Sequence, residues 1–167
     1  MGFIHPTAQI HPTSVIYPNV EIGPNVIIGP LCIIGAPAEW KGHEKEDKGV
    51  YIEKGCIITG LVTIDSGVER VTTIGESCYL MKHSHIGHDA ILGHYVTISC
   101  GAKIGGHCII QSYCNIGLNA VIHQKVEIPL WCMIGMGTVV TKKTEMKTLC
   151  KYVGNPARYL SPNLIKP

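Results

Sequence analysis

An isoleucine, or another aliphatic residue, recurs at every sixth position along most of this chain. The spacing holds over residues 4–34, resumes over 52–64 and then runs without a break over 74–140. This period of six is neither the 3.6 of an α-helix nor the alternation of a simple strand. It predicts a hexapeptide repeat that is interrupted twice.

Each hexad also has a compact side chain four residues after its aliphatic anchor, and a glycine often follows the anchor directly. The compact positions include Ala8, Ser14, Val26, Ala90 and Ala102, and the glycines include Gly23, Gly29, Gly87, Gly105 and Gly117. A hexad with two inward side chains and a flexible residue after the anchor is typical of a short strand that ends in a sharp corner. We therefore expect short strands joined by corners and stacked into coils.

This pattern resembles the left-handed parallel β-helix of the hexapeptide-repeat proteins, in which three hexads make one triangular coil. The hand follows from the resemblance, since ordinary parallel crossovers are right-handed. The resemblance implies an all-β fold with about seven triangular coils. We expect the β-helix to span residues 1–145, with loop excursions at about 36–50 and 66–73. Residues 146–167 are expected to form a C-terminal tail or cap, with a brief helix as one form of it.

Six of the eight cysteines fall at the compact inward position of a hexad, where a free thiol packs as a small hydrophobe. They are Cys32, Cys56, Cys78, Cys108, Cys114 and Cys132. Paired metal-binding spacings such as C-x-x-C are absent, so we expect neither a zinc site nor a disulfide framework.

Charge and hydropathy exclude several classes of partner. With 14 basic and 12 acidic residues, the net charge of +2 gives no electrostatic case for nucleic acid or an anionic membrane. No apolar stretch approaches the roughly 20 residues that span a bilayer, and the N-terminus lacks the pattern of a signal peptide. We expect a cytoplasmic protein with small-molecule chemistry, and no nucleic acid or membrane as partner.

The segment 82–89 (KHSHIGHD) holds three imidazoles and a carboxylate. Histidine exchanges protons near neutral pH, and Asp89 beside His88 can fix its tautomer and stabilise its protonated form. The competing interpretation is a polar surface segment. If one coil has 18 residues, residues 18 apart lie about 4.8 Å from each other. His88 then stacks on Gly106 and Gln124, and the Gly106 amide can face a developing oxyanion.

Several motifs together resemble the UDP-N-acetylglucosamine acyltransferase of lipid A synthesis and related nucleotide-sugar N-acyltransferases. They are HIGHD at 85–89, GGH at 105–107, VIHQ at 121–124, PAEWK at 37–41 and GN at 154–155. The resemblance implies a homotrimer with its site between subunits and a nucleotide-sugar acceptor. His88 would be the general base, Asp89 would orient it, and Gly106 would donate to the oxyanion. The substrate contacts implied are His85, His107, His123, Gln124 and Asn163.

Two departures bear on the donor and the acceptor. The acyl-carrier-protein-dependent members continue into a long helical domain, whereas residues 153–158 (VGNPAR) resemble the endings of coenzyme-A-dependent acetyltransferases. We therefore expect acetyl-CoA as the donor, with acyl carrier protein as the alternative. The His-Arg-Gly triplet of the lipid A enzyme reads Asp65-Ser66-Gly67 here. The acceptor group, hydroxyl or amine, stays open.

Two other functions compete. The fold is shared with the zinc-dependent γ-class carbonic anhydrases, and His83 and His88 have an offset that such ligands can show; Asp89 and the order of His107 and His123 favour the acyltransferase. A non-catalytic solenoid that binds a sugar nucleotide is the third possibility, because loss of activity would leave the fold intact.

Overall fold

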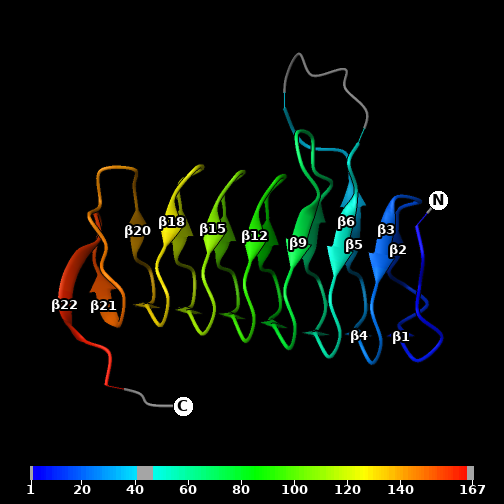
Figure 1. Cartoon of the computed structure of the whole chain (residues 1–167), viewed down its shortest axis with the longest axis horizontal. Coiled ribbons are helices and arrows are strands. Elements are labelled where there is room, and N and C mark those ends of the chain that lie inside the picture. Colours follow the sequence, from blue (N-terminus) through cyan, green and yellow to red (C-terminus); the bar gives the residue numbers. More distant parts are fainter. Residues whose placement is uncertain (1, 41–46, 165–167) are drawn as a thin grey trace.

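The computed structural model describes residues 2–40 and 47–164, and strands are the only regular elements in this part of the chain. The strands are short and almost all parallel, and they stack into the coils of a β-helix (Figure 1). The N-terminal coils lie at one end of the stack and β21 and β22 at the other. The predicted brief helix at the C-terminus is absent from residues 146–164.

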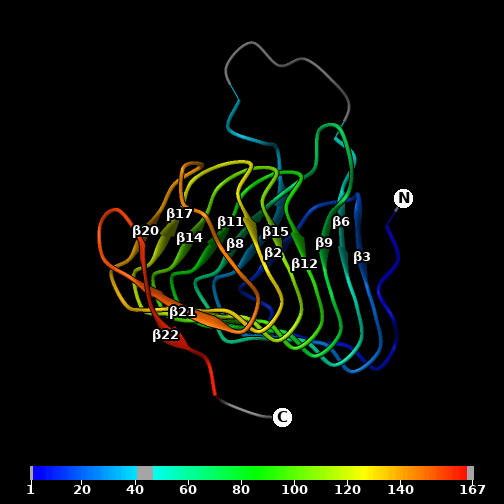
Figure 2. The ribbon, with the colours of Figure 1, turned by 60° about the vertical axis from the view of Figure 1, so that its left-hand side comes forward.

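Three sheets form the three faces of the solenoid. Figure 2 shows the solenoid rotated so that its C-terminal end comes forward. The first contains β1 (Gln9–Ile10), β4 (Ile27–Ile28), β7 (Ile57–Ile58), β10 (Tyr79–Leu80), β13 (Thr97–Ile98), β16 (Asn115–Ile116), β19 (Met133–Ile134), β21 (Cys150–Val153) and β22 (Arg158–Pro162). The second contains β2 (Val15–Ile16), β5 (Ile33–Ala36), β8 (Thr63–Asp65), β11 (His85–Ile86), β14 (Lys103–Ile104), β17 (Val121–Ile122) and β20 (Val139–Val140). The third contains β3 (Val20–Ile22), β6 (Val50–Ile52), β9 (Thr72–Ile74), β12 (Ile91–Leu92), β15 (Ile109–Ile110) and β18 (Glu127–Ile128).

The core consists of the two inward positions of each hexad. The aliphatic anchors from Ile22 to Val140 are buried, as are the six cysteines at compact positions. All eight cysteines are free, and only Cys100 and Cys150 are partly exposed. The packing of these thiols as small hydrophobes is as predicted.

The two ends of the solenoid depart from the regular pattern. Ile4, the first predicted anchor, lies at the end of the described stack and is 46% exposed, and Ile10 and Ile16 are only partly buried. At the other end β21 continues the first sheet and β22 turns back on it as an antiparallel hairpin. These additions bring the stack to about eight turns, against about seven expected. The hairpin covers the last coil, as a cap should.

The two interruptions of the repeat lie against each other. The amide of Lys48 donates to the carbonyl of Gly67 (2.7 Å), and the amide of Gly67 donates to the carbonyl of Gly49 (3.0 Å). The second excursion occupies only residues 66–71, since β9 begins at Thr72. It is the green loop above β9 in Figure 1. Among the described residues no helix has the length and apolar character needed to cross a bilayer.

Candidate active site

Three stacked corners bring most of the predicted site residues to one edge of the β-helix. β11 pairs with β14 and β14 pairs with β17, and His85 lies beside Lys103 in this register. The offset is 18 residues (103 − 85), as predicted. The amide of His107 donates to the carbonyl of His88 over 2.8 Å, which fixes one corner on the next. Positions 88, 106 and 124 therefore form a column.

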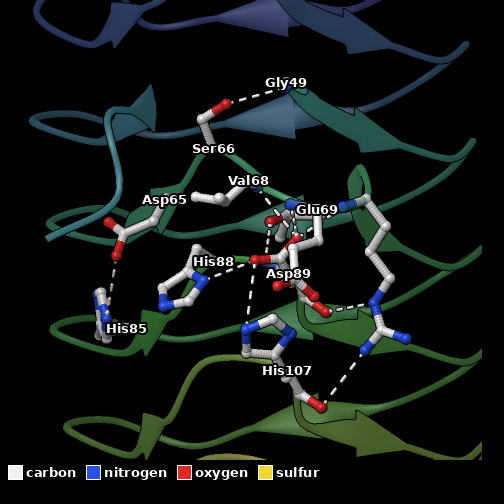
Figure 3. A network of polar contacts seen from close by, with 11 residues as sticks. Gly49, Asp65, Ser66, Val68, Glu69, His85, His88, Asp89 and His107 are labelled. Carbon is white, nitrogen blue, oxygen red and sulfur yellow. Dashed lines mark hydrogen bonds and ion pairs between the residues drawn. The ribbon is translucent and has the colours of Figure 1, made fainter. Parts of the chain in front are cut away.

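His88 and Asp89 form a close pair at the centre of this column (Figure 3). His88 Nδ1 lies 2.6 Å from Asp89 Oδ2, and Asp89 is completely buried. An ionised carboxylate only accepts hydrogen bonds, so neutral His88 carries its proton on Nδ1. Its Nε2 lone pair is left open to accept a proton from a substrate.

The second excursion holds the other oxygen of Asp89. Three consecutive backbone amides donate to Asp89 Oδ1, from Val68 (3.0 Å), Glu69 (2.8 Å) and Arg70 (2.7 Å). Burial alone would raise the pKa of this carboxyl, but the hydrogen bonds from His88 and the three amides outweigh it and lower the pKa. Asp89 is therefore an anion at neutral pH. It can stabilise a positive charge on His88 when the imidazole takes a proton.

Arg70 also ties two successive corners together. Its Nε donates to the backbone carbonyl of Asp89 over 2.7 Å, and its Nη2 donates to that of His107 over 3.3 Å. A planar guanidinium with several fixed donors suits such a bridge better than a flexible ammonium does. Arg70 therefore fixes the spacing between the corner that carries His88 and the corner that carries His107.

A pocket of about 270 Å³ opens in front of this pair. It is lined by Glu39, Trp40, His88, His107, Gln124 and Lys125. The ring of Trp40 stacks on His88, with centroids 5.5 Å apart and planes inclined by 21°. The first excursion thus carries an aromatic wall onto the site, a role that its polar sequence did not indicate. Burial lowers the pKa of His107, which favours its neutral form in this pocket.

Gly106 lies directly against the His88 ring. A side chain at this position would place its Cβ 2.6 Å from His88 Nε2, so only glycine leaves the imidazole in place. Within the described part of the chain, no group accepts a hydrogen bond from the Gly106 amide. The corner geometry leaves the amides of His88 and Gln124 without such a partner as well. A free N–H beside His88 Nε2 is what an oxyanion donor requires.

His85 lines a second, adjacent pocket of about 400 Å³ on the face formed by β5, β8, β11 and β14. Thr63, Asp65, Lys103 and Glu39 are among its other lining residues, and Glu39 lines the first pocket too. Burial, and secondarily the charge of Lys103, lower the pKa of His85. His85 is therefore mainly neutral near pH 7, and it lies one corner away from His88.

His123 and Asn163 are predicted contacts that line neither of these two pockets. His123 is exposed, and among the described residues it is not part of the pocket lining. Asn163 is buried near the C-terminus, where its Nδ2 donates to the carbonyl of Trp131 over 2.9 Å. That contact lies at another edge of the prism, beside Tyr95 and Tyr113. Within one chain, Asn163 supports the terminal hairpin.

One cluster at the site has metal-binding composition. Single ligand atoms of His88, Asp89 and His107 lie within 4.8 Å of one another. However, Asp89 Oδ1 already accepts three amide hydrogen bonds, and Oδ2 is bound to His88 Nδ1. His83, a ligand in the carbonic anhydrase alternative, is exposed and does not belong to this cluster. Within one chain, this donor set does not fit a three-histidine zinc site.

Comparison with known proteins agrees with this geometry. The family described as Bacterial transferase hexapeptide (six repeats) matches residues 3–36 and 72–106. Those two segments match the transferase hexapeptide repeat. Over 71 residues it is 32% identical to the acyl-[acyl-carrier-protein]–UDP-N-acetylglucosamine O-acyltransferase of Campylobacter concisus, an alignment that spans 41% of this chain and 27% of that protein. Over 59 residues it is 36% identical to the enzyme of the same name from Campylobacter curvus, spanning 34% of this chain and 22% of the relative.

Solved structures show the likeness over almost the whole chain. The UDP-N-acetylglucosamine acyltransferase from Campylobacter jejuni superposes with a TM-score of 0.79 at 25% identity, covering 97% of this chain and 75% of that one. LpxA from Acinetobacter baumannii gives a TM-score of 0.74 at 26% identity, covering 96% and 74%. The predicted fold class, a left-handed parallel β-helix, is confirmed. The alignments to the curated relatives span about a quarter of their length.

Sequence reasoning missed several parts of the site, most of which come from the two interruptions. The amides of residues 68–70, the side chain of Arg70 and the pocket positions of Glu39 and Lys125 did not follow from the hexad pattern. The break in the repeat at 65–73 was the available signal. An interruption beside a functional corner is a reasonable place to look for supporting contacts.

Proposed function

We propose that this protein is an acyltransferase that moves an acyl group from a thioester donor to a hydroxyl or amino group of a nucleotide-linked sugar. The observation that carries the proposal is the pair of His88 and Asp89, which leaves Nε2 open beside the free Gly106 amide. A base and an oxyanion donor within reach of one point are the parts that acyl transfer needs. The named activity of the relatives supports the same reaction class.

The reaction follows from these positions. The acceptor O–H or N–H donates to His88 Nε2 and loses its proton as the oxygen or nitrogen attacks the thioester carbonyl. The carbonyl oxygen becomes negative and accepts a hydrogen bond from Gly106, while Asp89 stabilises the imidazolium. The carbon–sulfur bond then breaks, and the departing thiolate takes the proton from His88. The products are the acylated sugar and a free thiol.

The binding residues form two groups. His107, Gln124 and the wall made by Trp40 surround the reacting centre in the first pocket. His85 lies in the adjacent pocket, which we assign to the acceptor sugar. His123 is exposed at the same edge, where it can contact a longer part of a substrate or a neighbouring subunit. We propose a homotrimer in which a second subunit closes the open side of the first pocket.

The donor is a thioester, and two carriers are candidates. The relatives are named for an acyl-carrier-protein donor, which favours an acylated carrier protein. The resemblance of residues 153–158 to coenzyme-A-dependent acetyltransferases favours acetyl-CoA. We propose UDP-N-acetylglucosamine or a related nucleotide sugar as the acceptor and a cytoplasmic location for the protein.

A matrix of donors and acceptors tests this proposal. Acetyl-CoA, longer acyl-CoA thioesters and acylated carrier protein are each incubated with a set of UDP- and dTDP-sugars, and products are identified by mass spectrometry. We expect one donor–acceptor combination to give an acylated nucleotide sugar, and His88→Ala to abolish most of it. Tight binding of a nucleotide sugar with no transfer from any donor would favour the non-catalytic alternative.

A further inference from the structure

Asp65 is a buried carboxylate whose charge the described residues leave largely uncompensated. It ends β8, is only 9% exposed and lines the pocket that contains His85. His85 is a chargeable neighbour, and its Nε2 lies 3.7 Å from Asp65 Oδ2 (Figure 3). Across residues 2–40 and 47–164, no group donates a hydrogen bond to this carboxylate. A buried anion without donors is costly.

Among the described residues, no lysine or arginine forms an ion pair with Asp65. Lys103 lines the same pocket, but its Nζ donates to the backbone carbonyl of His83. His85 shares its Nδ1 with the hydroxyl of Thr63 over 2.8 Å, and its pKa is lowered by burial and then by Lys103. Glu39, at the junction of the two pockets, adds a second negative charge. Burial and, after it, the charge of Glu39 raise the pKa of Asp65 to about 6.

The pocket is therefore open, negatively charged and adjacent to the proposed base. It has a volume of about 400 Å³, enough for a sugar ring. A positive charge on His88 acts to lower the pKa of Asp65, so the two side chains are near enough to interact electrostatically. A neutral hydroxyl could donate one hydrogen bond to Asp65. An ammonium donates and also compensates both carboxylates, which a hydroxyl cannot do.

We propose that Asp65 binds the ammonium group of an amino-sugar acceptor, so that the protein forms an amide. The inference rests on the proposed acyltransferase function and specifies its acceptor. The bound ammonium releases one proton to water, and the neutral nitrogen attacks the thioester carbonyl. His88 takes the second proton from nitrogen and gives it to the departing thiolate. One amide, one thiol and one free proton form per turnover, whereas transfer to a hydroxyl releases no net proton.

The test uses pairs of UDP-sugars that differ only in carrying a hydroxyl or an amine at one ring position. We expect the wild-type protein to prefer the amine by roughly 100-fold in kcat/KM and to release one proton per thiol. Asp65→Asn keeps the shape and removes the charge. It should lower kcat/KM for the amine roughly 10- to 100-fold, mainly through KM, and change kcat/KM for the hydroxyl less than about threefold.

Glu127→Gln is the matched control, because Glu127 is an exposed carboxylate on β18 that bonds Gln111 away from the pocket. It should leave the kinetics with both substrates unchanged. A wild-type preference for the hydroxyl, or an equal loss for both substrates in Asp65→Asn, would overturn the inference.

Binding of the amino sugar nucleotides, measured by calorimetry without a donor, separates this inference from the proposed function. Affinity that falls roughly 10-fold in Asp65→Asn supports the ammonium contact, even if the wild-type protein transfers no acyl group and the proposed function fails. Equal affinity for the two proteins overturns the contact, whatever the activity.

Discussion

Arg70 and Asp89 meet twice across one coil of the β-helix. The Arg70 amide donates to Asp89 Oδ1, and the Arg70 side chain donates through Nε to the Asp89 carbonyl, each over 2.7 Å. The first contact holds the carboxylate whose other oxygen lies against His88, and the second holds the backbone of the same residue. The second interruption of the repeat is therefore a support for the proposed base.

Arg70→Lys tests this support, because lysine keeps the charge but cannot bridge two carbonyls with fixed geometry. We expect kcat to fall roughly 10- to 100-fold with a smaller change in KM, as for other residues that orient a functional group. Arg158→Lys, an exposed position on β22, is the matched control and should behave like the wild-type protein. Steady-state kinetics of both variants, alongside their melting temperatures, check the result. Unchanged kcat in Arg70→Lys would assign Arg70 to the fold alone.

Gly106→Ala tests the close approach of the corner to the base. The added Cβ would lie 2.6 Å from His88 Nε2, so the imidazole must move or the corner must shift. We expect kcat to fall roughly 10²- to 10³-fold, similar to the loss of an oxyanion donor. Gly137→Ala is the control for a new methyl group without a clash, because no heavy atom lies within 4 Å of its Cβ; since Gly137 has a φ of +64°, this variant should lose roughly 1 kcal/mol of stability but keep its kcat. If Gly106→Ala folds and keeps wild-type kcat, the position assigned to the reacting carbonyl is wrong.

A pair of adjacent residues tests the register of the core. Ile116 is fully buried, and its neighbour Asn115 is exposed. Ile116→Asp places an unpaired carboxylate in the core and should reduce the free energy of unfolding by about 3 kcal/mol or more. Asn115→Asp, on the other face of the same strand, should change it by about 0.5 kcal/mol at most. Urea denaturation followed by circular dichroism compares them, and similar midpoints would contradict the assigned inward face.

Asp65 should make stability depend on pH in an unusual direction. Its pKa is about 6 in the folded protein, above the value of about 3.9 in an unfolded chain. The folded state therefore binds this proton more tightly, and the stabilisation is complete below about pH 4 and is lost as pH rises through about 6. Asp65→Asn removes the effect. The unfolding free energy of wild type relative to Asp65→Asn should fall by about 2 to 3 kcal/mol between pH 4 and pH 7. A difference that stays constant with pH would contradict the burial of this charge.

The fold could be predicted from the sequence because one local rule repeats. An aliphatic anchor every six residues sets the inward face of each strand, and three hexads per coil set the 18-residue offset that places position 88 on position 106. The cysteines follow the same rule, since a thiol suits the compact inward position. The first anchors deviate in being more exposed, since they lie at the end of the described stack.

The supports of the site could not be predicted in the same way. The hydrogen bonds from residues 68–70 to Asp89 depend on the path of an excursion that obeys no repeat. Trp40 reaches His88 from the other excursion, and its position depends on tertiary packing. Asn163 was assigned to substrate by resemblance, whereas its buried amide bonds the carbonyl of Trp131. Residues within the hexapeptide repeat could be placed from its period, whereas residues of the excursions and the C-terminal segment could be placed only from the three-dimensional structure.

The pH dependence of kcat/KM for the wild-type protein and for His88→Ala, measured with the acceptor and donor found in the matrix, tests the central claim most directly. The wild-type profile should rise with pH through the titration of a group that must be neutral. His88→Ala should lower kcat roughly 10²- to 10⁴-fold and remove that rising limb, while nucleotide-sugar binding and oligomeric state stay unchanged. Wild-type kcat/KM in His88→Ala at every pH would contradict the account and make His85 the next candidate for the base.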